Sequence, residues 1–257
     1  MVFSIEIGNS FIKSAVFDDN DIIISRSSFA SKTHRSSDEY RLLIKQFLDE
    51  TLQAKIDAVV ISSVVPSITP SVSRALEELF GIKPFIIGSG THTGFKLKIK
   101  DPSELGADIV SNTAAAKADH KTPIIIIDMD TATTLTAIDR SGDLTGVIIH
   151  PGIKVCASAL SDSAALLSDV DISKPKNLIG QNSAQSIQSG IINGHIAMID
   201  GLIERLSMEL CDNEDELSLV ATGEFSPYVV PFCKHSITID RDLTLRGSVI
   251  LYRMNRR

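Results

Sequence analysis

A run of four isoleucines from Ile124 to Ile127, followed by a short acidic segment, constrains the fold of this chain more than any other feature. The run is too short to span a membrane and too rich in β-branched side chains to favour a helix, so it predicts a buried β-strand. After the acidic segment 128–131, the segment 133–138 (TTLTAI) is again rich in β-branched residues. This pattern predicts a β-hairpin whose tight turn carries a carboxylate and hydroxyl groups.

The beginning of the chain repeats this hairpin. Residues 4–10 lead through a turn into the apolar segment 11–17. A shift of 122 positions pairs Glu6 with Asp128, Gly8 with Asp130 and Ala15 with Ala137. Because each hairpin opens about half of the chain, the repeat predicts a duplicated α/β protein with domains 1–118 and 119–257 and a ligand between them.

The composition is that of a soluble globular protein with space for about two domains. The chain has 257 residues, of which 43% are hydrophobic and 22% are charged. Its net charge of −7 argues against a general nucleic-acid or anionic-membrane surface. No apolar run approaches the ~20 residues needed to span a bilayer, and no signal peptide is evident.

The three cysteines, Cys156, Cys211 and Cys233, are widely spaced and form no CxxC pair. This spacing predicts neither a disulfide framework nor a zinc site, and it favours a reducing cytoplasm. His150, next to Pro151, is interpreted as a structural residue rather than a ligand.

Hydrophobic periodicity and turn residues predict the secondary structure of the first half. Ser62 and Ser63 end a predicted strand, where a ligand contact and a backbone hydrogen bond are equally consistent with the pattern. Asp108 lies about two turns into a predicted helix, a position where a lone aspartate is usually a surface group. The expected elements are a helix over 40–52, a strand over 57–65, a helix over 69–79 with Thr69 as its N-cap, a strand over 85–87 and a helix over 101–116 with Asp101 as its N-cap.

The second half is expected to end in helices. A long helix over 183–210 contains Gly190, Gly194 and Gly201. Each glycine costs a helix ~1 kcal/mol relative to alanine, so a backbone or a ligand is expected to approach closely there. The other expected elements are a strand over 146–152, a weakly structured stretch over 161–182, strands over 218–222 and 237–240, and a closing helix over 243–254 whose Arg253 begins a solvated tail.

The order of these segments, more than any one of them, resembles the type III pantothenate kinases. The resemblance covers essentially the full chain. The matching segments are 6–10 (EIGNS), 61–66 (ISSVVP), 102–109 (PSELGADI), 128–133 (DMDTAT), 146–152 (GVIIHPG), 182–194 (NSAQSIQSGIING) and 222–224 (TGE).

This resemblance implies a fold like that of actin, the sugar kinases and the chaperone ATPases, with two duplicated ribonuclease H-like domains around a nucleotide cleft. It also implies transfer of the γ-phosphate of ATP to the 4′-hydroxyl of pantothenate, the first step of coenzyme A synthesis. The family works as a homodimer in the cytoplasm. It uses a divalent cation such as Mg²⁺ and a monovalent cation such as K⁺ or NH₄⁺.

The resemblance also implies a role for individual residues, because tight turns bind phosphate through backbone N–H groups and carboxylates bind Mg²⁺. Asp108 is the expected general base. Glu6 and Asp128 are the expected metal ligands. The expected ATP-binding residues are Glu6, Gly8, Asn9, Ser10, Asp130, Thr131, Ala132, Thr133, Thr222 and Gly223, and the expected substrate-binding residues are Ile99, Gly106, Ala107, Asp108, Ile109 and Ser183.

Several of these positions depart from the family pattern. Glu6 stands where the family has aspartate, Asp130 and Glu224 where it has glycine, Ile109 where it has arginine, and Ile99 where it has tyrosine. Asp130 tolerates positive φ less well than glycine and places a second negative charge in a phosphate-binding turn. Three hypotheses follow: a pantothenate kinase with reduced or altered activity, a degenerate paralogue that acts as a binding or regulatory protein, and a kinase for another small hydroxylated substrate.

Overall fold

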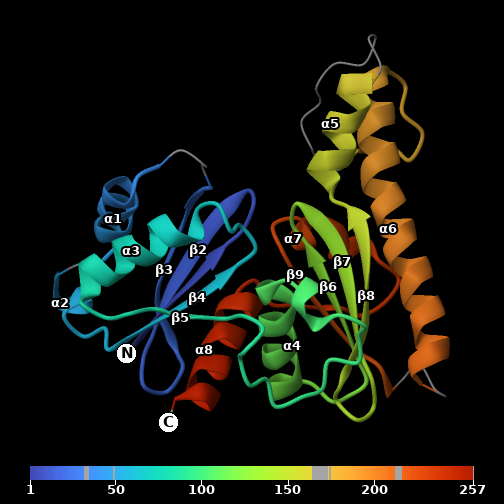
Figure 1. The fold of residues 1–257 in the computed structure, drawn as a ribbon. Coiled ribbons are helices and arrows are strands. Elements are labelled where there is room, and N and C mark those ends of the chain that lie inside the picture. Colours follow the sequence, from blue (N-terminus) through green and yellow to red (C-terminus); the bar gives the residue numbers. More distant parts are fainter. Residues whose placement is uncertain (32–34, 49, 164–172, 174, 212–215, 257) are drawn as a thin grey trace. The chain divides into compact units, whose positions relative to one another are not determined.

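The computed structural model describes residues 1–256 apart from 32–34, 49, 164–172, 174 and 212–215 (Figure 1). The chain forms two compact units. The first unit contains residues 1–96, 100–118 and 242–257, and the second contains residues 97–99 and 119–241.

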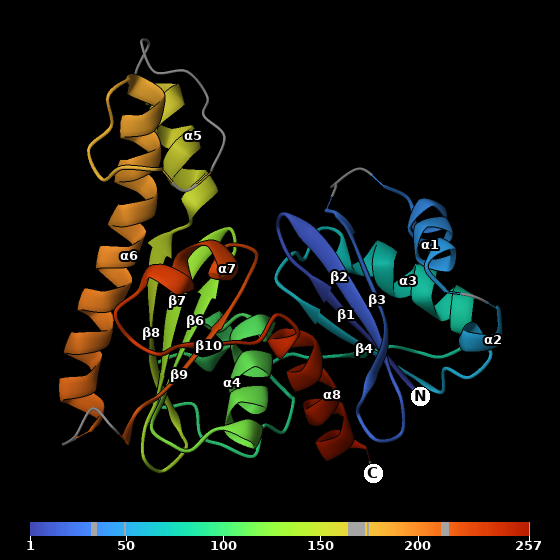
Figure 2. The same ribbon diagram turned by 180° about the vertical axis from the view of Figure 1, so that it is seen from behind.

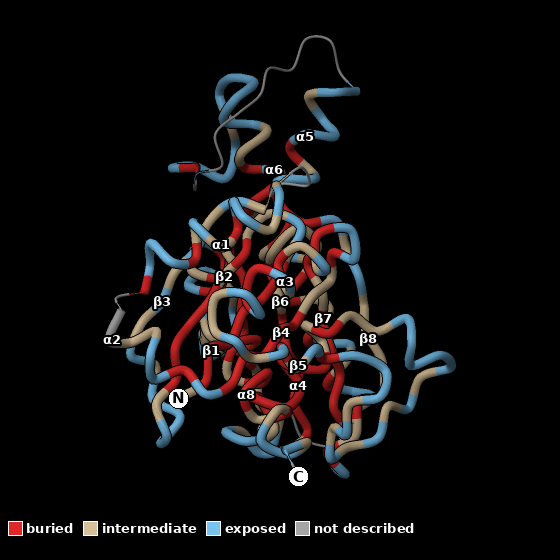
Figure 3. Tube along the Cα trace, turned by 60° about the vertical axis from the view of Figure 1, so that its left-hand side comes forward, coloured by how far each residue is buried: buried red, intermediate tan, exposed pale blue. Residues whose placement is uncertain are grey.

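The first unit is built on a five-stranded mixed sheet in the order β3-β2-β1-β4-β5. The central strand β1 is antiparallel to β2 and parallel to β4. Every residue of β1 is buried, because both faces of the sheet are covered (Figure 3). The strands are β1 (Val2–Ile7), β2 (Phe11–Phe17), β3 (Ile23–Ala30), β4 (Ala58–Ser63) and β5 (Phe85–Ile86).

Alternate side chains of β1 enter two different hydrophobic cores, as the period of two in a strand requires. Phe3, Ile5 and Ile7 pack on the face that is covered by α1 (Ser37–Gln46) and α3 (Thr69–Phe80), and the short α2 (Glu50–Gln53) precedes β4. Val2 faces the opposite core, which contains apolar residues of α4 (Ala107–Asp119) and α8 (Leu243–Asn255). Figures 1 and 2 show these helices on the two sides of the sheet.

The second unit repeats this sheet in the order β10-β9-β6-β7-β8. The isoleucine run forms β6, which is antiparallel to β7 and parallel to β9. In Figure 1, α5 lies along one end of the long helix α6. The elements are β6 (Ile124–Met129), β7 (Ala132–Ile138), β8 (Leu144–Pro151), α5 (Ile153–Ser163), α6 (Ser183–Leu210), β9 (Ser218–Thr222), α7 (Ser226–Val229), η3 (Val230–Phe232) and β10 (Thr238–Ile239).

The duplication predicted from the two hairpins is therefore confirmed, since the two sheets have the same size and strand order. The predicted register is wrong beyond the turn. Three residues, 8–10, separate β1 from β2, but only Asp130 and Thr131 separate β6 from β7. Ser4 pairs with Ala15, whereas its counterpart Ile126 pairs with Thr136 and not with Ala137. The shorter second turn changes the shift between the repeats from 122 to 121.

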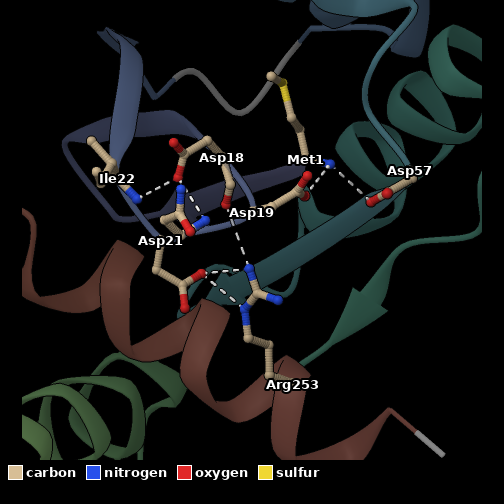
Figure 4. Close-up of polar contacts among 8 residues, drawn as sticks. Met1, Asp18, Asp19, Asp21, Ile22, Asp57 and Arg253 are labelled. Carbon is tan, nitrogen blue, oxygen red and sulfur yellow. Dashed lines mark hydrogen bonds and ion pairs between the residues drawn. The ribbon is translucent and has the colours of Figure 1, made fainter.

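The compact units differ from the predicted domains at the end of the chain. Asp119 begins the main segment of the second unit, but α8 packs against β1 and β4 of the first. Arg253 of α8 is part of this packing and not of a solvated tail, because its guanidinium pairs with Asp21 at 2.6 Å (Figure 4). Asp21 occupies the turn between β2 and β3 with a φ of 62°.

Three predicted helix boundaries also change. Asp101 caps a single 3₁₀ turn, η1 (Pro102–Glu104), by accepting the N–H of Ser103, and α4 begins separately at Ala107. Thr69 is not an N-cap, because its hydroxyl donates to the carbonyl of Val65 at 2.8 Å. The helix expected over 40–52 is two helices, α1 and α2. The long helix over 183–210 is confirmed.

The stretch expected to be weakly structured, 161–182, includes the end of α5, and its residues 164–172 and 174 lie outside the described residues. Among the residues that the structure describes, none of the helices has both the length and the apolar character needed to cross a bilayer.

Candidate active site

The carboxylate of Glu6 lies at the carboxyl end of β1, the edge at which parallel α/β sheets bind ligands. Glu6 pairs with Lys13 of β2 across the hairpin and with Ser62 of β4 on its other side. The Lys13 Nζ lies 3.9 Å from Glu6 Oε2, and Glu6 is only 8% exposed. A buried carboxylate is therefore held beside a cation in the first hairpin.

The turn that follows is closed by Gly8, whose N–H donates to the carbonyl of Phe11 at 3.0 Å. A Cβ at Gly8 would lie 3.0 Å from the same carbonyl, so a larger residue would crowd the turn. Asn9 is exposed, and the carbonyl of Ser10 accepts the N–H of Ser31. The predicted phosphate-binding residues of the first unit thus form one compact turn.

Asp108 lies in the first turn of α4 and folds back over Gly106. Its Oδ1 accepts the N–H of Ile109 at 2.7 Å and lies 2.2 Å from the position of a Cβ at Gly106. Val64, just beyond β4, lies 3.1 Å from that same position. Glycine at 106 therefore leaves the space that the Asp108 carboxylate occupies, and Val64 borders the same space.

In the second unit, Asp128 occupies the position that Glu6 has in the first, between Thr134 of β7 and Thr222 of β9. The loop after β9 passes directly over it. A Cβ at Gly223 would lie 2.5 Å from the backbone of Met129 and 2.7 Å from Asp128 Oδ1. Gly223 also has a φ of +90°, a conformation that other residues rarely adopt.

The second turn is occupied by the carboxylate of Asp130. Its Oδ1 accepts the backbone N–H of Glu224 at 2.6 Å. The Lys154 ammonium in turn donates to Glu224, to Oε1 at 2.9 Å and to Oε2 at 3.0 Å. Asp130 and Glu224, which both depart from the family pattern, thus belong to one connected polar network that includes a backbone N–H of the expected nucleotide loop.

The expected backbone strain at Asp130 is absent, because Asp21 is the one non-glycine residue with positive φ in the described part of the chain. The positive φ is instead found at Gly223. If a phosphate is to bind at this turn, the expected obstacle is the charge of Asp130 and its bond to the Glu224 N–H, and not its own backbone conformation.

The remaining residues of this hairpin leave one polar atom without a partner. Thr133 is fully buried, and its hydroxyl makes no hydrogen bond within the described residues. Thr222 is also buried, while Ala132 is half-buried at the start of β7. The carbonyl of Thr131 accepts the N–H of Gly152, which fixes the turn against the end of β8.

The expected substrate-binding residues are divided between the units. Gly106, Ala107, Asp108 and Ile109 lie at the start of α4 in the first unit. Ile99 belongs to the segment 97–99 of the second unit, where Leu97 bridges Leu144 of β8. Ser183, the first residue of α6, is exposed and lines a cavity of about 680 Å³ in the second unit.

The carboxylates suit a hard divalent cation, because Mg²⁺ prefers oxygen ligands. Asp128 fits this role because it lies at the edge of the second sheet. The loop after β9 approaches it closely at Gly223, where a side chain would collide with Asp128 Oδ1. In the first unit, Glu6 has a carboxylate at the equivalent position of its own sheet, and Lys13 balances part of its charge.

Sequence reasoning missed two cations, Lys13 and Lys154. Lys13 could have been found from the sequence, because a hairpin with its turn at residues 8–10 places Lys13 opposite Glu6. Lys154 had no comparable signal, since it lies 70 residues before Glu224 in the chain.

Comparisons with known proteins identify the family of this chain and its fold. The sequence model of the family described as type III pantothenate kinase matches residues 2–205. A type III pantothenate kinase of Shouchella clausii is 34% identical, over 99% of this chain and 100% of that protein.

Solved structures show the fold. A Campylobacter jejuni protein described as a Baf family transcriptional activator superposes with a TM-score of 0.59 and 16% identity, over 98% of both chains. The polyphosphate/ATP-glucomannokinase of an Arthrobacter species superposes with a TM-score of 0.50 and 11% identity, over 99% of both chains. The expected actin-like and sugar-kinase-like architecture is therefore confirmed.

Proposed function

Since this chain belongs to the type III pantothenate kinase family, we propose that it transfers the γ-phosphate of ATP to the 4′-hydroxyl of pantothenate, the first step of coenzyme A synthesis. The observation that carries the proposal is the pair of equivalent hairpins, each with a carboxylate at the end of its central strand. Tight turns of this kind bind phosphate through backbone N–H groups.

Asp108 is the proposed general base, because its carboxylate is held at the start of α4 by Gly106 and the Ile109 N–H. In the reaction, Asp108 accepts the proton of the pantothenate hydroxyl while the hydroxyl oxygen forms a bond to the γ-phosphorus. The bond between that phosphorus and the bridging oxygen of ADP breaks, and ADP leaves. Glu6 and Asp128 are the proposed metal-binding carboxylates, and a bound Mg²⁺ would supply charge neutralisation on the phosphates.

A coupled ADP-release assay with MgATP, pantothenate and potassium tests the proposal, with the phosphorylated product identified by mass spectrometry. We expect Asp108→Asn to reduce turnover ~10²-fold or more, the usual scale for loss of a general base. Asp101→Asn is the matched control, because Asp101 is an exposed carboxylate seven positions earlier whose capping role an asparagine can perform. Equal turnover in Asp108→Asn and the wild type would assign the base to another residue.

A second function is favoured by the network of Asp130, Glu224 and Lys154. The Asp130 carboxylate already accepts the N–H of Glu224 in the expected nucleotide loop. A protein that keeps the fold and lacks phosphoryl transfer would act as a binding or regulatory protein. Product formation by the wild-type chain would exclude this reading. Nucleotide binding without product from pantothenate or other small hydroxylated substrates would support it.

Other features of the family are proposed for this chain as well. We propose that it forms a homodimer, requires K⁺ or NH₄⁺ in addition to Mg²⁺, and works in the cytoplasm. Omission of potassium and ammonium from the assay above tests the monovalent cation.

A further inference from the structure

Three side chains from separate elements of the second unit converge on a single carbonyl oxygen. His150 ends β8, Cys156 lies in α5 and His195 lies in α6, and one ligand atom from each lies within 4.8 Å of the others. The carbonyl oxygen of Pro151 lies 2.8 Å from His150 Nδ1, 3.3 Å from His195 Nε2 and 3.6 Å from Cys156 Sγ. Within the described residues, these two histidines and one cysteine form the cluster whose ligand atoms lie close enough together to hold a metal ion.

The environment of His195 points to a cation. His195 is only 3% exposed, and both of its ring nitrogens face backbone carbonyls, since Nδ1 lies 2.8 Å from the oxygen of Ile191. A neutral imidazole carries one N–H, so it can donate to only one of the two carbonyls. If Nδ1 donates its N–H to the Ile191 carbonyl, Nε2 has no proton to share with the Pro151 oxygen. A metal ion that binds both Nε2 and the Pro151 oxygen explains why these two atoms lie close together. Donation of the other ring N–H to a backbone carbonyl is how ligating histidines are commonly oriented.

The distances suit a tetrahedral ion. Zinc bonds of ~2.0–2.3 Å place neighbouring ligand atoms ~3.3–3.8 Å apart. The separations of 3.3 Å and 3.6 Å from the Pro151 oxygen to His195 Nε2 and Cys156 Sγ fall in that range. His150 is half-buried at the end of its strand, and its Nδ1 lies closer to the same oxygen, at 2.8 Å, so its ring has to turn away from that oxygen to bind the ion.

The donor set also selects the kind of ion. Two imidazoles and a thiolate bind Zn²⁺ and similar transition metals, whereas Mg²⁺ and K⁺ prefer oxygen ligands. The three side chains line a cavity of about 680 Å³, which gives an ion and a water ligand access to them.

We propose that His150, Cys156 and His195 form a transition-metal site that binds one Zn²⁺ per chain and ties the start of α5 to the middle of α6. The argument for this site does not use the proposed kinase activity, although Ser183, an expected substrate-binding residue, lines the same cavity. It escapes detection in the sequence because its ligands are not arranged in a short motif but come from a strand end and two helices.

Zinc and cobalt binding to the full chain, first freed of metal by dialysis against a chelator, test the proposal. Wild type should bind one Zn²⁺ per chain with an increase in thermal stability. Co²⁺ should produce a thiolate charge-transfer band that Zn²⁺ removes. Cys156→Ser should abolish the band, and both Cys156→Ser and His150→Asn should weaken Zn²⁺ binding ~100-fold or more. We choose His150 and Cys156 because they are half-buried, whereas a substitution at the buried His195 could disturb the fold itself.

Matched controls distinguish the site from metal binding elsewhere. Cys211→Ser removes a thiol at the end of α6, and His92→Asn removes an exposed imidazole in the first unit. Both should keep wild-type affinity and the cobalt band. A wild type without stoichiometric binding, or a band retained in Cys156→Ser and lost in Cys211→Ser, would overturn the proposal. Equal Zn²⁺ affinity in all four variants would also do so.

Discussion

At the scale of single residues, Asp130 has the largest predicted effect on ligand binding. Its Oδ1 accepts the Glu224 N–H at 2.6 Å, so a carboxylate occupies a donor in the loop that is expected to receive the nucleotide. A like charge ~4 Å from a phosphate costs up to ~4 kcal/mol at an effective dielectric near 20, and the partial exposure of Asp130 lowers that value. We therefore expect the network with Glu224 and Lys154 to oppose phosphate binding at this turn.

We predict that Asp130→Gly binds MgATP at least about tenfold more tightly than wild type, by titration calorimetry at constant salt, because it removes the charge and frees the Glu224 N–H. Asp130→Asn separates the two effects, since its side-chain oxygen still accepts the N–H but carries no charge. Its affinity should lie between those of the other two proteins. Tight binding by wild type that weakens in Asp130→Gly would instead make Asp130 a cation ligand.

Gly223 is the second residue with a predicted individual effect. With a φ of +90° and Met129 backbone atoms 2.5 Å from the position of a Cβ, the loop after β9 accepts no side chain at this residue. Gly223→Ala should lower the free energy of unfolding by ~2 kcal/mol or more in urea denaturation. Gly146→Ala in β8 is the control, because its Cβ would meet open space. A smaller loss in Gly223→Ala than in Gly146→Ala would contradict this reading of the loop.

At the scale of elements, the segment 97–99 attaches to the second sheet through Lys98. Its ammonium pairs with Asp143 at 3.1 Å and with Asp139, and its N–H donates to the Leu144 carbonyl. A hydrogen bond to Asp139 raises the pKa of Lys98. Burial opposes ionisation of Asp139, but the bond from Lys98 and the N–H groups of its loop outweigh burial and lower its pKa.

These shifts determine the pH range in which the ion pair stabilises the segment. The lowered pKa of Asp139 gives a contribution that is present above pH ~4 and disappears as pH falls through its folded pKa. The raised pKa of Lys98 gives a contribution that is present below pH ~10.4 and disappears as pH rises further. Lys98→Met should therefore lower the Tm at pH 7 and lower it by less near pH 3.

Thermal unfolding followed by circular dichroism at these two pH values measures the difference. Lys100→Met, an exposed lysine two positions later, is the control and should have the same small effect at both values. A Tm difference between Lys98→Met and wild type that persists unchanged at pH 3 would show that Lys98 acts through packing rather than charge.

At the scale of the whole molecule, the predicted homodimer has support in the second unit. Gly190, Gly194 and Gly201 lie on one side of α6, and a Cβ at any of them would meet no atom of the described chain within 4 Å. The close approach expected at these glycines is therefore not made by the described residues. Leu178 and Ile179, which precede α6, and Met208 near its end are large apolar side chains that are 72–82% exposed, and we expect a partner subunit to cover them.

Light scattering at micromolar concentration should report about twice the chain mass. Ile179→Asp should shift the protein toward a monomer, because a buried unpaired charge is costly at an apolar interface. Ile22→Asp changes a similarly exposed isoleucine in the first unit and should leave the mass unchanged. A wild-type monomer at this concentration would refute the dimer, whereas a dimer in Ile179→Asp would place its interface elsewhere.

The sequence by itself determined the duplicated fold, the carboxylate at the end of each central strand and the long helix 183–210. These features depend on local patterns, such as the β-branched run at 124–127 and the turn that follows it, because side-chain alternation and turn chemistry act over a few residues. The position of Asp108 on a helix was equally predictable from its surroundings in the chain.

Only the tertiary structure decided which groups these elements bring together. Asp130 meets the N–H of Glu224 across 94 residues, and Glu224 meets Lys154 across 70. The cluster of His150, Cys156 and His195 is assembled from β8, α5 and α6 in the same way. Helix α8 packs on the first sheet although it ends the chain. Such contacts depend on how buried surfaces pack in space, and no periodicity along the chain records them.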